Sequence, residues 1–198
     1  MIHLRSYTAP PMDRREILRY AGVRGEAADV EAVLEECLRE AAPILTYRAC
    51  FCELEVKQKE NRIMLGEHSV NSSALAARLQ GCSRAVILAA TVGIALDRLI
   101  ARYSASMPSK AVLFSAIGDE RVEALCDCLC EELSEQYAKV GATLCARFSP
   151  GYGDLPLEFQ NVIFSELHCS GKLGLCLGEN LLMTPSKSVT AIVGIKDQ

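Results

Sequence analysis

One continuous apolar stretch, RAVILAATVG at residues 84–93, constrains the fold of this chain more than any other segment. A strand with one face in solvent alternates apolar and polar residues, whereas this one is apolar at almost every position after Arg84. The apolar run continues to residue 96, which is shorter than the roughly 20 residues that a membrane-spanning helix needs. We therefore expect a strand that is covered on both faces and lies at the centre of its sheet.

The rest of the chain predicts helices and strands in an irregular order. Predicted helices cover a short stretch within residues 11–25, then 27–41, 71–81, 94–104, 108–117, 120–138 and 157–167. Predicted strands cover 47–57 and 61–67 as a hairpin, 84–93, 142–148, 172–177, and a C-terminal pair at 180–184 and 188–195. This order does not fit a doubly wound βα repeat. The prediction is a single α+β domain over residues 1–198, in which residues 1–25 form an N-terminal arm and short helix.

The composition argues against several classes of function. Among 198 residues there are 21 Lys and Arg against 25 Asp and Glu, giving a net charge of −4, and there is no Trp. Such a chain has no general attraction for nucleic acid or for an anionic membrane, and it offers few aromatic rings for base stacking. The N-terminus lacks the apolar segment of a secretory signal. We expect a cytoplasmic protein that binds neither nucleic acid nor membrane.

Ten cysteines are present, and no two have the C-x-x-C spacing of zinc or redox motifs. In the stretch CDCLC, helical geometry places Cys126 and Cys130 on one face and Cys128 on another, so the three cannot hold one ion. We expect small core residues in a reducing cytosol and no metal site. A redox or iron–sulfur role is the less favoured alternative.

Common catalytic and nucleotide-binding motifs are absent. The segment AATVGIALDRL has one Gly between a strand and a helix, but the chain has no G-x-G-x-x-G series, P-loop, H-E-x-x-H or G-x-S-x-G. Acidic residues along the long helix are expected to form a solvated face; they are Asp119, Glu120, Glu123, Glu131, Glu132 and Glu135.

The loop RFSPGYGDLP at residues 147–156 combines an Arg, a Gly and an aromatic ring directly after a predicted strand. A turn needs only Gly and Pro, whereas a binding loop benefits from a Gly that lets the backbone approach a ligand. Taken alone, the loop fits a surface turn and a binding loop equally well.

Together with the C-terminal segment, this loop resembles the activation domain of vitamin B12-dependent methionine synthase. The family's Arg-x-x-x-Gly-Tyr motif matches Arg147, Gly151 and Tyr152, and Pro150 also agrees. A Met-x-Pro-x-x-Ser-Val pattern falls on Met183, Pro185, Ser188 and Val189. The chain is similar to free-standing members of the family from about residue 15 onward. The resemblance implies a helmet-like α+β domain built on a curved, mainly antiparallel sheet flanked by helices.

The resemblance also implies a function. The family binds S-adenosylmethionine and supports reductive remethylation of inactive Co(II) cobalamin, with the electron coming from a flavodoxin-like donor. The chain would then be an accessory activation subunit for a cobalamin-dependent methionine synthase or another corrinoid protein, inactive without that partner. The alternative is a non-catalytic module that senses S-adenosylmethionine or docks on another corrinoid protein.

Site residues follow from the same resemblance. Arg147 can grip the methionine carboxylate of S-adenosylmethionine, because a guanidinium offers a planar fork of donors. Gly151 would admit the ligand close to the backbone, Tyr152 would line it or face the corrin, and Glu131 matches the family's helical acid. The full set of expected ligand-binding residues is Arg147, Ser149, Pro150, Gly151, Tyr152 and Glu131. No catalytic residue is predicted.

Overall fold

A mainly antiparallel sheet organises the chain, whose computed structural model describes residues 1–24 and 28–197. Its strand order is β4–β3–β2–β5–β9–β6, with β1 added along β2, and every pairing in the described residues is antiparallel. These seven strands are β1 (His3–Ser6), β2 (Arg48–Lys59), β3 (Arg62–Leu65), β4 (His68–Asn71), β5 (Arg84–Thr91), β6 (Ala142–Leu144) and β9 (Ser188–Asp197). A separate two-stranded ribbon joins β7 (Cys176–Leu177) to β8 (Met183–Thr184).

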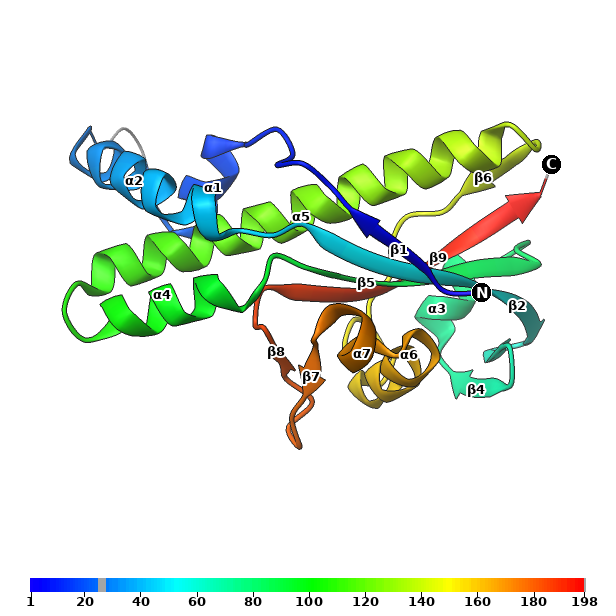
Figure 1. Ribbon diagram of the computed structural model, residues 1–198. Coiled ribbons are helices and arrows are strands. Elements are labelled where there is room, and N and C mark those ends of the chain that lie inside the picture. The colour runs from blue at the N-terminus through cyan, green and yellow to red at the C-terminus, as the bar shows by residue number, and fades with distance from the viewer. Residues whose placement is uncertain (25–27, 198) are drawn as a thin grey trace.

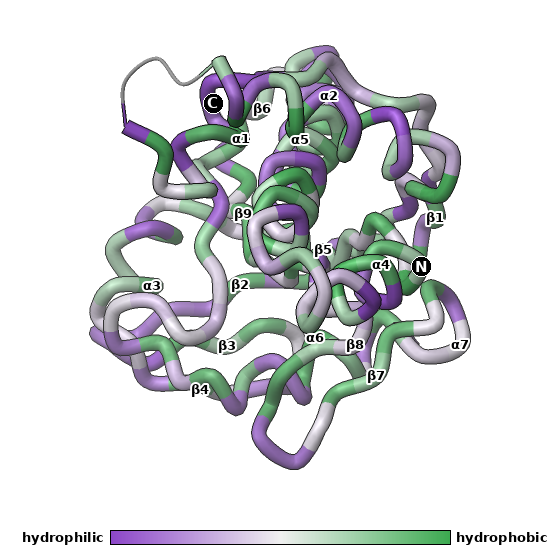
Figure 2. The backbone as a smooth tube through the Cα atoms, turned by 90° about the vertical axis from the view of Figure 1, so that its left-hand side faces the viewer, coloured by the Kyte–Doolittle hydropathy of each residue, from purple (hydrophilic) through white to green (hydrophobic). Residues whose placement is uncertain are grey.

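Helices cover both faces of this sheet (Figure 1). One face carries α1 (Arg14–Tyr20), α2 (Ala28–Ala41), α4 (Ile94–Ser104) and α5 (Pro108–Ala138). The other carries α3 (Ser73–Arg78), α6 (Gln160–Leu167) and α7 (Cys169–Leu173). Short 3-10 helices lie at Ala42–Ile44 and Leu157–Phe159. The view in Figure 2 shows apolar strand segments between α5 above and α6 below.

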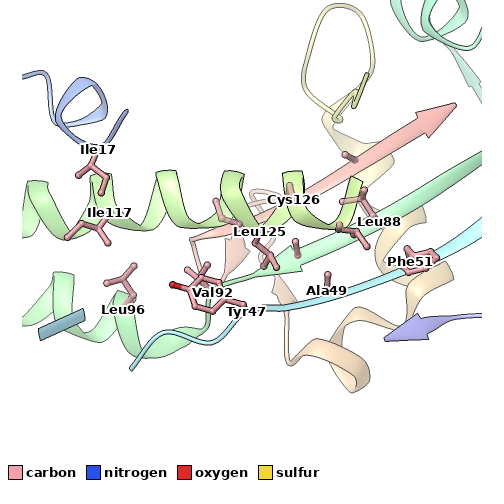
Figure 3. Packing of buried hydrophobic residues seen from close by; sticks show 14 of the residues in the cluster. Ile17, Tyr47, Ala49, Phe51, Leu88, Val92, Leu96, Ile117, Leu125 and Cys126 are labelled. Atoms are coloured by element: carbon pink, nitrogen blue, oxygen red, sulfur yellow. The ribbon is translucent and has the colours of Figure 1, made fainter. Parts of the chain in front are cut away.

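Strand β5 divides the core in two, as expected for a central strand. Alternate residues of β5 face opposite clusters: Val86, Leu88 and Ala90 on the α5 side, and Ala85, Ile87 and Ala89 on the α6 side. Figure 3 shows the first cluster, in which Leu88, Val92 and Leu125 lie between α5 and the strands. Burial on both faces explains the continuous apolar sequence. The predicted fold class, a mainly antiparallel sheet flanked by helices, is confirmed.

The long helix α5 departs from the prediction of two helices at 108–117 and 120–138. It runs unbroken through Gly118, which is buried. A Cβ at Gly118 would lie 2.6 Å from Leu96 of α4 and 2.6 Å from Lys187. Gly costs a helix about 1 kcal/mol relative to Ala, and the close packing that it permits here offsets that cost.

Three of the strand predictions, the last of them a pairing, also need correction. Residues 172–177 were expected to be a strand, but Cys169–Leu173 is helical and only Cys176–Leu177 is extended, because Cys169 and Leu173, one helical turn apart, are buried together. The strand expected at 142–148 stops at Leu144. The expected C-terminal pair does not form, since β8 pairs with β7 while β9 pairs with β5 and β6.

Other expectations are met more closely. The β2–β3 hairpin forms, and Ser72 caps α3 by accepting a hydrogen bond from the Leu75 amide. Strands β1 and β4 were not predicted. Gly25 and residue 27, at the ends of the first two predicted helices, lie outside the described residues. None of the described helices combines the length and the apolar character that crossing a membrane requires.

Candidate functional site

A β-bulge between β6 and β9 positions Arg147. Leu144 pairs with Ile195, and Phe148 bridges to Ile192. The chain therefore advances four residues from Leu144 to Phe148, while the opposite strand advances only three between their partners. Such a bulge leaves one residue unpaired and redirects nearby side chains. The chain leaves the sheet after Cys145 and returns at Phe148, which places Arg147 over the face covered by α5.

Arg147 lies on the wall of a hollow of about 610 Å³, where its Nη2 donates to two carboxylates of α5. The distances are 3.0 Å to Glu123 Oε2 and 2.6 Å to Asp127 Oδ1. Arg78 of α3 also lines the hollow, and Tyr152 stands at its rim with 68% of its surface exposed. Cations and carboxylates therefore face the same space.

The charge of Arg147 is stable in this setting. Burial lowers the pKa of the guanidinium, but the acidic groups of Cys126, Glu123 and Asp127 raise it by more, so the pKa lies above its ordinary value. All described hydrogen bonds from the Arg147 guanidinium use Nη2. Nε and Nη1 make no hydrogen bond to the described residues, so their N–H groups remain as donors for an anionic ligand.

A second hollow, of about 540 Å³, adjoins the first and shares Glu123 and Asp127 with it. Its opposite wall is the N-terminal arm, including Pro10, Pro11 and Asp13. The Asp13 carboxylate caps α1 by accepting from the amides of Arg15 and Glu16. The two hollows together form an acidic depression along one side of α5.

A buried ion pair holds the arm against α5. Arg121 contacts Glu120 and donates from Nη1 to the Pro10 carbonyl at 2.6 Å and from Nη2 to the Pro11 carbonyl at 2.7 Å. Glu120 Oε1 in turn accepts from the Asp13 amide at 2.9 Å. Glu120 is therefore buried, and its expected place on a solvated helix face is wrong.

The loop after Arg147 is anchored at its far end by Asp154. The Asp154 carboxylate accepts from the hydroxyls of Ser72 and Ser73 and from the amides of Ser73 and Ala74. These bonds, led by that from Ser72, hold the pKa of Asp154 well below its usual range. The loop is thereby tied to the N-terminus of α3.

Gly151 forms the turn itself. Its φ is +88°, a region that residues with a Cβ rarely adopt, and its amide donates to the Leu155 carbonyl. A Cβ here would lie 3.2 Å from Leu157. The glycine is thus required by the backbone geometry of the loop.

The predicted site residues are distributed unevenly. Arg147, Ser149 and Tyr152 line the first hollow, whereas Pro150 is buried and Gly151 shapes the turn. Glu131 lines the second hollow and does not contact Arg147 among the described hydrogen bonds.

The carboxylates that do bind Arg147, Glu123 and Asp127, were not predicted as site residues. Their spacing of four, continued at Glu131, places all three on one stripe of a helix, and this was the available signal.

The cysteines divide by location. Cys37, Cys50, Cys52, Cys126 and Cys169 are buried, in line with the expected core role. Cys176 is exposed, so that expectation is wrong there. Within residues 1–24 and 28–197, no group of three or more His, Cys, Asp and Glu side chains is arranged to hold a metal ion.

Comparisons with known proteins give one informative result. No family model matches the sequence, and no curated protein matches it significantly. Among solved structures, the chain is similar to one described as "Crystal Structure of the MetH Reactivation Domain bound to AdoHcy". The TM-score is 0.76 at 13% sequence identity, covering 98% of this chain and 78% of that one. This chain therefore has the fold of the MetH reactivation domain.

Proposed function

We propose that this chain binds S-adenosylmethionine in the hollow beside Arg147 and supports reductive remethylation of a corrinoid on a cobalamin-dependent methionine synthase. The observation that carries the proposal is the bulge that turns Arg147 toward Glu123 and Asp127. The shared fold supports it, because the structural neighbour is described as bound to AdoHcy. We also propose that residues 1–198 act as one activation-like domain.

The hollow suits a ligand of this chemistry. Its volume of about 610 Å³ lies within the range of about 300–1,000 Å³ that is common for small-molecule sites. The Nε and Nη1 donors of Arg147 would bind the ligand carboxylate, and Arg78 would add a second cation. Glu123 and Asp127 supply negative charge for the sulfonium and acceptors for ribose hydroxyls. Glu131, on the same stripe of α5, would extend the acidic wall, while Ser149 and the backbone around Gly151 would contact the ligand.

The chain's contribution would be to hold the methyl donor. Bound S-adenosylmethionine would supply the methyl group, leaving S-adenosylhomocysteine when its sulfur–carbon bond breaks. The acceptor would be cobalt on the partner, and one electron from a flavodoxin-like donor would make it nucleophilic. Tyr152, exposed at the rim, would contact that partner.

Calorimetry with S-adenosylhomocysteine and S-adenosylmethionine is the first test. We expect one site for each ligand on the isolated protein, with no turnover. Absence of binding for both ligands would contradict the proposal.

The second test mixes the protein with a Co(II) cobalamin-loaded synthase, S-adenosylmethionine and a low-potential reductant. The methylcobalamin absorption spectrum should appear faster as the concentration of this protein rises, since the two proteins are added as separate molecules in this assay. An equal rate without this protein would exclude the activation role. Binding of S-adenosylmethionine without methylcobalamin formation would instead favour a sensing or docking module.

A further inference from the structure

Two cysteines from distant parts of the sequence meet over strand β9. Cys82 precedes β5 and Cys145 follows β6, and their Sγ atoms are 3.6 Å apart. Because β9 lies between β5 and β6, the two thiols approach one another across this strand. The separation is within roughly 1.5 Å of sulfur–sulfur bonding distance.

Gly194 of β9 makes this approach possible. A Cβ at Gly194 would lie 2.8 Å from Cys82 Sγ and 3.3 Å from Cys145 Sγ, so any side chain there would occupy the space of the thiols. The Cys145 amide also donates to the Gly194 carbonyl at 2.9 Å, which fixes Cys145 against this position. The close contact is therefore built into the sheet.

The pair can be reached from solvent. Cys145 lines the hollow beside Arg147, and Cys82 is partly exposed. The pKa of Cys82 is raised to about 11, mainly by burial and secondly by the hydrogen bond with the neighbouring Cys145 thiol. Cys82 is thus protonated at neutral pH, and we take Cys145, which is also partly exposed, as the thiol that meets the oxidant first.

We infer that Cys82 and Cys145 form a reversible disulfide across β9 and make the Arg147 segment sensitive to oxidants of the disulfide class. The Cys145 thiolate attacks one sulfur of glutathione disulfide, which gives a mixed disulfide and releases one glutathione. The Cys82 thiol then loses its proton and attacks Cys145 Sγ, which releases the second glutathione. The protein loses two electrons and two protons, and glutathione disulfide gains them.

This reaction would alter the hollow. Cys145 lies two residues before Arg147, inside the segment that contains the bulge. Drawing its sulfur toward Cys82 shifts the start of that segment. The inference does not depend on the proposed ligand, because formation of the disulfide is measured by itself.

The test is titration of the full chain with glutathione disulfide and glutathione, followed by intact mass and peptide mapping without reduction. We expect the loss of two hydrogen atoms and one cross-linked peptide pair containing Cys82 and Cys145. In Cys82→Ser, the product should instead carry one glutathione on Cys145. A Cys176→Ser control, at the exposed cysteine, should keep the internal disulfide.

A second variant tests the geometry. Gly194→Ala should push the thiols apart and reduce disulfide formation at least several-fold. Gly171→Ala is the matched control, because a Cβ there has no neighbour within 4 Å. Circular dichroism of the reduced variants shows whether each is folded. If the folded wild-type protein gives no cross-linked peptide pair containing Cys82 and Cys145, or if Cys145 is joined to another cysteine, the inference is overturned.

Discussion

Two arginines contact carboxylates of the same helix, α5, yet they lie in contrasting surroundings. Arg121 has 1% of its side chain exposed and binds Glu120, also buried, and two carbonyls of the arm. Arg147 has 21% exposed and binds Glu123 and Asp127, whose side chains are 44% and 64% exposed. Arg147 lines the depression along α5, whereas Arg121 lies buried and binds the arm that forms the opposite wall.

Burial accounts for the difference in role. The donors of Arg121 are directed to protein acceptors, so this residue fixes the arm in place. Removing one partner of a buried pair leaves the other charge without compensation, whereas exposed carboxylates recover their hydration. Arg147 is therefore suited to binding a ligand and Arg121 to holding the structure. The same pair of ionic groups can serve either purpose.

Replacing Arg121 should have the largest effect on stability. In Arg121→Met, Glu120 and the carbonyls of Pro10 and Pro11 lose their buried donor. We expect the free energy of unfolding to fall by about 3–5 kcal/mol, measured by urea denaturation. Arg147→Met is the matched control, with an expected loss of about 0–1 kcal/mol. Equal losses in the two variants would remove the distinction.

Ligand binding should show the opposite order. Arg147→Met should weaken S-adenosylhomocysteine binding by on the order of 2–5 kcal/mol, which is well over tenfold, while the protein remains folded. Isothermal titration calorimetry measures the affinity, and circular dichroism monitors the fold. Unchanged affinity in a folded Arg147→Met variant would show that Arg147 is only a structural ion pair.

Gly151 tests whether the loop side of the depression depends on its turn. Gly151→Val places a β-branched residue at φ +88° and a Cβ against Leu157. The backbone strain is of order 1–3 kcal/mol, so we expect a moderate loss of stability and loss of the ligand-induced rise in Tm. Tyr152→Phe serves as the control for the neighbouring position. A normal ligand-induced shift in Gly151→Val would show that the loop does not shape the site.

Replacing Asp154 should have the smallest effect on stability, and this effect should depend on pH. Its pKa in the folded protein is depressed, so it stabilises the fold above its unfolded pKa of about 3.9, and that contribution is lost as pH falls through the folded value. The difference in unfolding free energy between wild type and Asp154→Asn should be present at neutral pH. It should shrink as pH falls below about 4. Urea denaturation at several pH values measures it, and a constant difference would mean that the Asp154 charge is not involved.

Local patterns in the sequence were enough to predict much of the fold, but they predicted less of the site. The helical periodicity of α2 and the apolar run of β5 each show which side chains of a single element are buried. Both patterns can therefore be recognised in a short stretch of sequence. The resemblance identified Arg147 and its loop. The partners of Arg147 were missed because acidic residues on a helix usually face solvent, and nothing local to Glu123 or Asp127 shows which side chain lies opposite.

The sequence by itself determined where the chain is buried on both faces, where the β2–β3 hairpin turns, and which loop contains a glycine four residues after an arginine. These features depend on neighbours within a few positions. Only the tertiary structure decided that α5 continues through Gly118, that the segment 145–147 bulges from the sheet, and that Arg121 lies buried. It also decided that Cys82 meets Cys145 over Gly194. Each of these outcomes depends on the space left by residues far away in the chain, because close packing fixes which side chains and glycines can coexist there.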